Sequence, residues 1–238
     1  MVSRRTYLTY PRSVLLFSAL LVLTSSSAQA AIAMVQSNGN YTSSASSFSL
    51  AFTSNTTRGN LIVVCLDFSY GSNFSAVSDT QANTFTQAGV EVAASNVVRS
   101  RCYYAPKIAG GADTVTFTIT SGPAFMELYI DEVSGAAYSS PLDQFCNVNT
   151  TQATVSCGVT AALSNEILIG HSYSQGSATA GTGFTTDSAA NGNLTEHKIV
   201  STAGTYTISA GSTGTYCNLI GIAFKSQLLF FIKRRDDP

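Results

Sequence analysis

The amino-acid sequence predicts an all-β protein, a single antiparallel β-sandwich of jelly-roll-like topology that follows an N-terminal signal peptide. Apolar and polar residues alternate with a period of two in many short segments, and clusters of Gly, Ser, Asn and Pro separate those segments. A parallel α/β fold needs amphipathic helices of about 10–15 residues between its strands. The sequence has no such helical pattern after its first 30 residues.

The N-terminal segment has the organisation of a secretory signal peptide. Three arginines precede the apolar run 14–23, and Ala28-Gln29-Ala30 supplies the small residues that a signal peptidase requires. The apolar run is too short to span a bilayer. We therefore expect a secreted or cell-surface protein with three parts, which are a signal peptide at 1–30, a β-sandwich domain at 31–225 and a short apolar and basic tail at 226–238.

Charge and hydropathy exclude two classes of partner. Residues 1–30 hold three arginines and no acidic residue, so their removal changes the net charge from −1 to −4. A mildly acidic protein lacks the basic surface that nucleic-acid binding requires, so we predict no nucleic-acid partner. The apolar run 228–232 in the tail is too short for a stable membrane span in the mature chain.

Individual strands are predicted from their alternation. In 61–68 the residues Ile62, Val64, Leu66 and Phe68 share one face, which is expected to enter the core. Segment 174–192 is expected to be a long loop that holds at most one short strand, at 183–186. No repeat of 20–50 residues is evident. The predicted strands are 61–68, 97–104, 113–120, 125–133, 166–173, 194–200, 205–209 and 216–224.

Five cysteines lie after residue 30, so at least one is unpaired within the monomer. Cys146 and Cys157 flank ten residues rich in Asn and Thr, and we predict that a hairpin or loop joins them in a disulfide. Cys65, Cys102 and Cys217 lie in apolar strand-like runs and are expected to be small buried side chains. No CxxC spacing occurs, and the chain has 2 histidines, so we predict neither a metal nor a cofactor.

Strand and turn formers recur in six stretches, which are 58–64, 77–85, 103–115, 132–135, 140–143 and 165–170. In their order these stretches resemble a group of uncharacterised, secreted bacterial β-sandwich domains with jelly-roll-like topology. The resemblance covers most of 33–225. It implies a fold and an extracytoplasmic setting, and it implies no activity.

Two features resemble catalytic motifs. Gly170-His171-Ser172-Tyr173-Ser174 is similar to the nucleophile elbow of α/β-hydrolases, but Ser174 stands where the second glycine is needed and no helix follows. A triad would have to use His197, with Asp187 before it. Asp131 and Glu132 resemble the acid pair of a glycosidase, yet neighbours on a strand point to opposite faces.

Two further sets of carboxylates have simpler interpretations. Asp79 and Asn83 bracket a turn and lack the spacing of a calcium loop, so Asx-type turn chemistry is the preferred explanation. Glu127 and Asp131 share one strand face, which we interpret as the solvated side of the sheet.

No set of residues has the types and spacing that a known chemistry requires, so no catalytic residue is predicted. The function that we expect is a non-catalytic binding or adhesion module for an extracellular glycan or cell-surface ligand. The absence of tryptophan weakens a lectin-like role. A structural surface or matrix component is the second expectation, and a secreted hydrolase is the third.

Overall fold

The computed structural model describes residues 28–229, and in that part the chain has no helix and is 67% strand. Every strand pair is antiparallel. The prediction of an all-β antiparallel fold is confirmed. Nearly all of the predicted signal peptide and most of the predicted tail lie outside the described residues. Between residues 28 and 229 no helix has the length and apolarity needed to cross a membrane.

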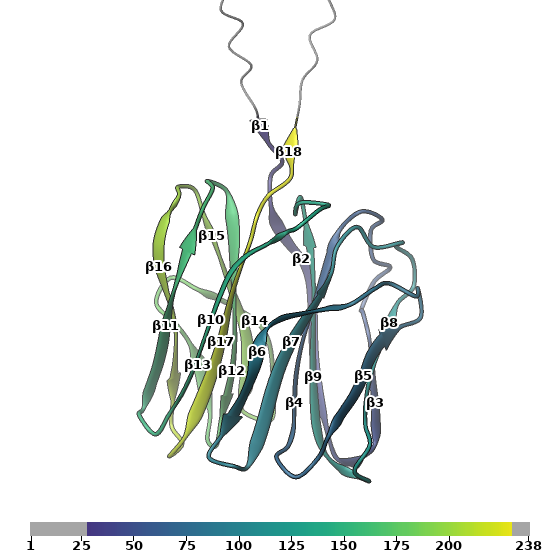
Figure 1. The fold of residues 1–238 in the computed structure, drawn as a ribbon, viewed down its shortest axis with the longest axis vertical. Coiled ribbons are helices and arrows are strands. Elements are labelled where there is room, and N and C mark those ends of the chain that lie inside the picture. The colour runs from purple at the N-terminus through teal and green to yellow at the C-terminus, as the bar shows by residue number, and fades with distance from the viewer. Residues whose placement is uncertain (1–27, 230–238) are drawn as a thin grey trace, which may run out of the picture.

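The N-terminal half contains eight strands in two sheets (Figure 1). A five-stranded N-terminal inner sheet has the order β2-β9-β4-β7-β6, and a three-stranded N-terminal outer sheet has the order β3-β8-β5. The bounds are β2 (Ala33–Ala45), β3 (Ser47–Ala51), β4 (Leu61–Ser69), β5 (Phe74–Asp79), β6 (Thr86–Ala94), β7 (Val98–Ala105), β8 (Thr114–Ile119) and β9 (Ala124–Ser134).

The C-terminal half repeats this arrangement. Its inner sheet has the order β10-β17-β12-β15-β14 and its outer sheet the order β11-β16-β13, so adding eight to each N-terminal label gives the C-terminal order. The bounds are β10 (Leu142–Thr150), β11 (Thr154–Ala161), β12 (Glu166–Ser174), β13 (Ala178–Ala180), β14 (Thr185–Ala190), β15 (Asn193–Val200), β16 (Gly204–Ser212) and β17 (Cys217–Phe224). The short strands β1 (Ala28–Gln29) and β18 (Leu228–Leu229) pair with each other at one end of the molecule.

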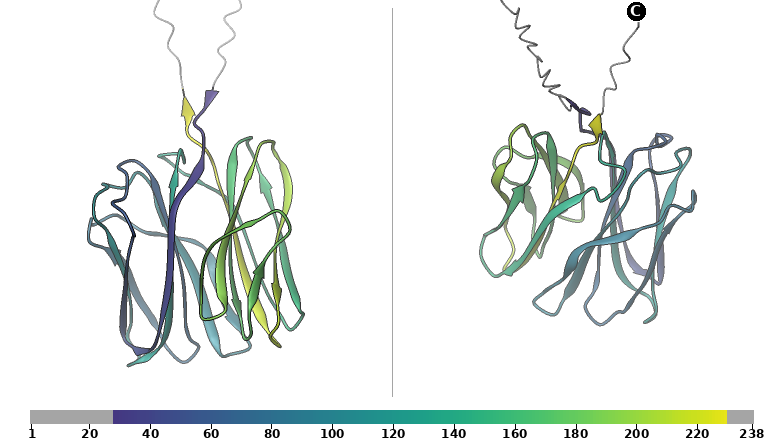
Figure 2. Two further views of the ribbon diagram at one scale, coloured as in Figure 1. Left: turned by 180° about the vertical axis from the view of Figure 1, so that it is seen from behind. Right: turned by 45° about the horizontal axis from the view of Figure 1, so that its top comes forward.

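The four large sheets stack as outer, inner, inner and outer layers (Figures 1 and 2). Three apolar cores fill the spaces between them. Each half has a core between its inner and outer sheets, and a third core lies between the two inner sheets. This stack has more layers than the single sandwich predicted from the sequence, because the inner sheets use both faces for burial.

Strand β4 demonstrates this double burial. Ile62, Val64 and Leu66 face the outer sheet of their own half, as predicted, while Leu61 and Val63 face the other half. All five side chains are at most 1% exposed. Burial of each such side chain contributes about 2 kcal/mol to stability.

Two disulfides and one buried free thiol account for the cysteines. The pairing predicted for Cys146 and Cys157 is present, and it joins β10 to β11. Cys65 and Cys102 are buried, as expected, and they lie opposite each other on β4 and β7, where they form a disulfide that the sequence did not predict. Cys217 is buried and free, as expected.

All eight predicted strands are present. They correspond to β4, β7, β8, β9, β12, β15, β16 and β17, with boundaries that differ by a few residues. Segment 174–192 is more ordered than expected, because it contains β13 and β14.

Glycine allows close packing in the C-terminal half: a Cβ on Gly221 would lie 2.7 Å from Ile208 Cδ1 and 2.8 Å from Cys146 Sγ.

The two disulfides are expected to stabilise the protein unequally. Their sequence separations are 37 for Cys65–Cys102 and 11 for Cys146–Cys157. Because the longer loop loses more chain entropy, replacing the first pair by alanines should lower the free energy of unfolding by about 4 kcal/mol and replacing the second pair by about 3 kcal/mol. Urea unfolding measures both values. A Cys217→Ala variant is the control, and a larger loss for the Cys146–Cys157 pair would contradict the prediction.

Candidate functional site

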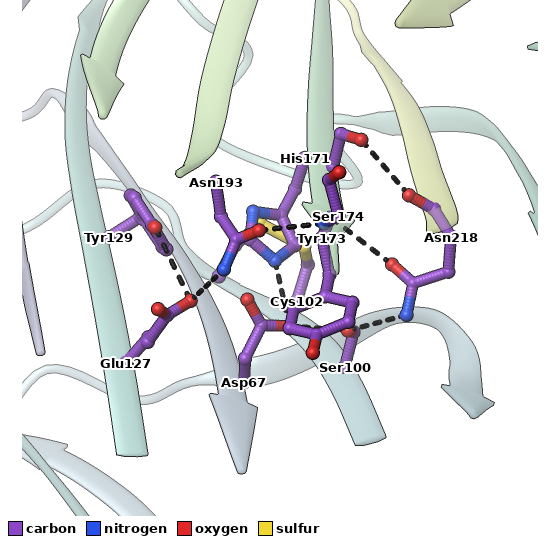
Figure 3. A network of polar contacts seen from close by, with 12 residues as sticks. Asp67, Ser100, Cys102, Glu127, Tyr129, His171, Tyr173, Ser174, Asn193 and Asn218 are labelled. Carbon is purple, nitrogen blue, oxygen red and sulfur yellow. Dashed lines mark hydrogen bonds and ion pairs between the residues drawn. A yellow bond between two sulfur atoms is a disulfide. The ribbon is translucent and has the colours of Figure 1, made fainter. Parts of the chain in front are cut away.

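Polar side chains interrupt the apolar contact between the two inner sheets at one end. On the N-terminal inner sheet, strand pairing places Asp67 of β4 directly opposite Ser100 of β7 and Glu127 of β9. His171 of β12 and Asn218 of β17 reach them from the C-terminal inner sheet (Figure 3). All five side chains are completely buried. Burial on this scale requires that each polar group finds a partner.

Asp67 is the centre of the first part of this network. Its Oδ1 accepts a hydrogen bond from Ser100 Oγ and lies 3.1 Å from His171 Nε2, which donates to it. Asn218 Nδ2 donates to Ser100 Oγ over 2.8 Å. The Tyr129 ring packs against the His171 ring with centroids 5.1 Å apart. The contact from Asp67 to His171 therefore links the two halves of the protein.

Glu127 is the centre of the second part. Its Oε2 accepts a hydrogen bond of 2.5 Å from Asn193 Nδ2, and Asn193 Oδ1 accepts one of 2.6 Å from the backbone N–H of Ser174. The Tyr129 hydroxyl donates to the carbonyl of Ala190 over 2.9 Å (Figure 3 shows the Tyr129–Glu127 contact beside it). Asn193 thus bridges a carboxyl group of one half and the backbone of the other.

Asp67 and Glu127 are cross-strand neighbours on β4 and β9, so their buried carboxyl groups lie close together. Two carboxylates cannot both be ionised at such a position, so one of them carries a proton. Burial and the neighbouring Asp67 charge raise the pKa of Glu127 to about 9. Glu127 is therefore protonated at neutral pH.

A second cluster lies nearer the β2 and β14 edge. His197 Nδ1 and Asp187 Oδ1 are 2.5 Å apart, and the His197 side chain is 17% exposed. Burial raises the pKa of Asp187, an effect that the His197 contact opposes. Asp131 is wholly buried beside it, and burial together with the Asp187 charge raises the pKa of Asp131 well above its usual value.

The structure corrects the interpretation of Glu127 and Asp131 as the solvated side of a sheet. Both are at most 1% exposed, because the C-terminal half covers this face. Asp131 and Glu132 do point to opposite faces of β9, as expected. Glu132 faces away from the other half and accepts hydrogen bonds from Gln36 Nε2, the backbone N–H of Thr57 and Asn60 Nδ2, a pattern that fixes the 52–60 loop.

The elbow-like segment does not have the geometry of a nucleophile site. Ser172 lies within β12, which continues to Ser174, and its hydroxyl donates to the carbonyl of Asn218. The Ser172 side chain is completely buried. Strand pairing places Ser172 opposite Leu194, whereas His197 lies opposite Ile169. His197 and Asp187 pair as a triad would require, but Ser172 is not brought to them.

An open pocket of about 580 Å³ lies at the opposite end of the N-terminal half, among the loops that connect its strands. These loops are 52–60, 80–85 and 106–113, together with the 135–141 connection between the halves. They lie at the same end of the molecule as β1 and β18 (Figure 1). The residues that line the pocket include Arg58, Gly59, Gln81, Asn83, Lys107 and Tyr138. We call it the loop pocket.

Asx-type turn chemistry shapes one wall of the loop pocket. Asp79 Oδ1 accepts from the backbone N–H of Asn83 over 2.8 Å, and Asp79 Oδ2 accepts from Asn83 Nδ2 over 2.6 Å. Asn83 Oδ1 accepts in turn from the backbone N–H of Ala109. Gln81 Nε2 donates to the carbonyl of Ala112. Asp79 and Asn83 thus tie two loops together, and in the described part of the chain no cluster of three or more His, Cys, Asp or Glu side chains is placed to hold a metal.

The repeated strand order provides an internal comparison for the loop pocket. The C-terminal counterparts of 52–60, 80–85 and 106–113 are 162–165, 181–184 and 201–203, and each is shorter. Both halves fold with the same strand order, so folding does not require the longer loops. Extra loop length on one copy of a scaffold is typical of a binding function.

The sequence singled out only Asp79 and Asn83 from this pocket. Nothing in the spacing of Arg58 and Lys107 in the sequence predicts that they meet Tyr138. Tyr138 lies three residues after Gly135. The sequence distinguishes it only as an aromatic residue in a connection rich in Gly and Ser.

Comparison with known proteins identified no matching family model, no similar curated protein and no similar solved structure.

The buried carboxyl groups predict a protein that is more stable in mild acid than in mild alkali. Burial raises the pKa of Glu127 to about 9 and that of Glu166 and Glu196 to about 7, from an ordinary value of 4.5. The folded protein keeps protons that the unfolded chain releases near pH 4.5, so its stability falls as the pH rises. The melting temperature is expected to decrease from about pH 5 to pH 9.

A Glu127→Gln variant tests the assignment of this effect. The amide replaces a protonated carboxyl group and does not titrate, so the decrease between pH 7 and 9 should become smaller. Glu91→Gln, at a partly exposed acid paired with Arg101, is the matched control and should leave that slope unchanged. An unchanged slope in Glu127→Gln would contradict the protonated state assigned to Glu127.

Proposed function

We propose that the protein is a secreted, non-catalytic binding module that holds an extracellular glycan or cell-surface ligand in the loop pocket. The observation that carries this proposal is the set of lengthened loops on one of two copies of the same scaffold, which surround a pocket with an exposed aromatic wall. Tyr138 is 53% exposed although its backbone N–H is fixed by Gln227 Oε1 over 2.9 Å. An exposed aromatic ring with adjacent amides suits the apolar faces and hydroxyl groups of a sugar.

Secretion is supported by two independent features. The two disulfides are typical of proteins from oxidising compartments. The predicted leader 1–30 ends just before β2, so its removal leaves both eight-stranded halves complete. The distribution of successive strands over inner and outer sheets within each half supports the proposed jelly-roll-like topology.

N-terminal sequencing of exported protein is expected to find Ala31 as the first residue. Ala28-Gln29-Ala30 provides the small side chains that signal peptidase selects. Retention of the full chain in the cytosol, or an exported protein that begins at Met1, would contradict the proposed compartment.

The hydrolase alternative has less support. Its required serine is completely buried in the middle of β12, and the buried acids have no access to a substrate. The structural alternative is supported by the exposed edges of the sheets, since an unpaired edge can add a strand from another molecule.

Replacement of Tyr138 by alanine is expected to weaken glycan binding about tenfold, which is the loss of about 1.4 kcal/mol of stacking energy. A glycan array identifies ligands of the secreted protein, and titration calorimetry compares the variants. Tyr138→Phe should retain most of the affinity. Tyr41→Ala, at a tyrosine on β2 that is 46% exposed and does not line the loop pocket, is the matched control.

Two outcomes would count against the proposal. Equal loss of affinity in Tyr138→Ala and Tyr41→Ala would place the ligand elsewhere. Absence of binding to every glycan on the array, together with ordered assemblies in electron micrographs of concentrated protein, would favour the structural alternative.

A further inference from the structure

The loop pocket holds two cations without an acidic partner. Among residues 28–229, neither Arg58 nor Lys107 has a carboxylate oxygen within 4.0 Å, whereas Arg99, Arg101 and Lys225 each have one. Arg58 and Lys107 are both exposed. They are concentrated in a protein whose net charge is −4 once the proposed leader is removed. Two unpaired cations in one pocket of an acidic protein indicate a site for an anion.

The acids nearest to the loop pocket are already engaged. Both carboxylate oxygens of Asp79 accept from Asn83, and Asp113 accepts from the Thr80 hydroxyl. Glu132 lies behind the 52–60 loop and accepts three hydrogen bonds there. No acidic side chain lines the pocket. Arg58 and Lys107 are therefore available to bind an anionic ligand.

Backbone contacts hold together the two loops that carry Arg58 and Lys107. The 52–60 and 106–113 loops exchange hydrogen bonds between Thr56 and Gly111, each of 2.8 Å, and the N–H of Gly59 donates to the carbonyl of Ile108 over 2.9 Å. Lys107 has a φ of 55°, a left-handed conformation that costs about 1–3 kcal/mol outside glycine. The pocket is thus preorganised, which reduces the entropy lost when a ligand binds.

We propose that the loop pocket recognises a carboxylated sugar, such as a uronate residue within an acidic polysaccharide. The inference rests on the proposed glycan-binding function and specifies its ligand class. Arg58 offers a planar donor pair that matches a carboxylate, and Lys107 adds a second positive charge. Tyr138 packs on the sugar ring, and Gln81 offers an amide to its hydroxyl groups. A volume of about 580 Å³ lies within the range of small-ligand pockets.

A sugar fits these features better than a nucleic acid or an acidic peptide. A nucleic acid presents closely spaced phosphates, and its binding requires a long basic surface rather than two cations on an acidic protein. An acidic peptide offers a carboxylate but no rigid ring with an apolar face for Tyr138. The carboxylated sugar uses the cations and the aromatic wall together.

Calorimetric titration of the secreted protein with trigalacturonate, and with a neutral trisaccharide of the same length, tests the proposal. Trigalacturonate is expected to bind at least tenfold more tightly. Arg58→Gln and Lys107→Gln should each weaken its binding about tenfold, since each removes a charge-assisted contact. Lys198→Gln, at a lysine on β15 outside the pocket, is the matched control and should bind as the wild type does. Melting temperatures confirm that each variant is folded.

The outcomes separate this inference from the proposed function. Equal affinity for neutral and acidic trisaccharides, with dependence on Tyr138, would overturn the acidic preference and leave glycan binding intact. Absence of binding to every saccharide would overturn both. Equal weakening by Lys198→Gln would show a non-specific charge effect and overturn the inference. If a glutamate-rich peptide bound as tightly as trigalacturonate, the result would indicate an acidic peptide as the ligand and overturn the inference of a carboxylated sugar.

Discussion

The packing of one five-stranded sheet against another determines most of this structure. Because each inner sheet also covers an outer sheet, strands such as β4 and β12 have no face in water. A polar side chain on the contact faces must then be neutral, paired or both. The Asp67–His171 contact, the protonated Glu127 and the bridging Asn193 meet part of this requirement at one end of the contact, where Asp67 Oδ2, Glu127 Oε1 and His171 Nδ1 have no hydrogen-bond partner among the described residues. Apolar side chains fill the rest of the contact.

A buried polar network between two halves has a different consequence from an apolar contact. It provides directional bonds, so the halves pack in one register and not in a neighbouring one. The strand pairing within each inner sheet aligns Asp67 with Glu127 and Ser100, and the opposing sheet must present His171 and Asn218 at the same level. Apolar side chains alone would tolerate a shift along the contact. The buried acids Asp67 and Glu127 thus take part in the contact between the two halves.

The two ends of the N-terminal half differ in the length of their connections. Tight turns close the end near the polar network, and long loops open the other end into the loop pocket. Asp67 contacts His171 and Asp187 contacts His197 inside the molecule, whereas among residues 28–229 neither Arg58 nor Lys107 has a carboxylate oxygen within 4.0 Å. The C-terminal half has the same strand order with short connections, so it serves as a partner for the contact between the sheets. Uncompensated charge on these loops is the feature on which the proposed ligand binding rests.

The sequence alone determined the all-β antiparallel class, the eight strands that lie between two neighbours and the Cys146–Cys157 pairing. Every predicted strand is one with a neighbour on both sides, such as β4 or β16, because such strands carry a continuous or alternating apolar pattern. The edge strands, such as β2 and β10, bury less and carry no clear signal. Only the tertiary structure decided that Cys65 meets Cys102, that Glu127 is covered and that Arg58, Lys107 and Tyr138 share one pocket. These contacts are between residues that are far apart in the chain. The alternation of apolar residues within a strand predicts which face is buried, but it does not predict which other segment covers that face.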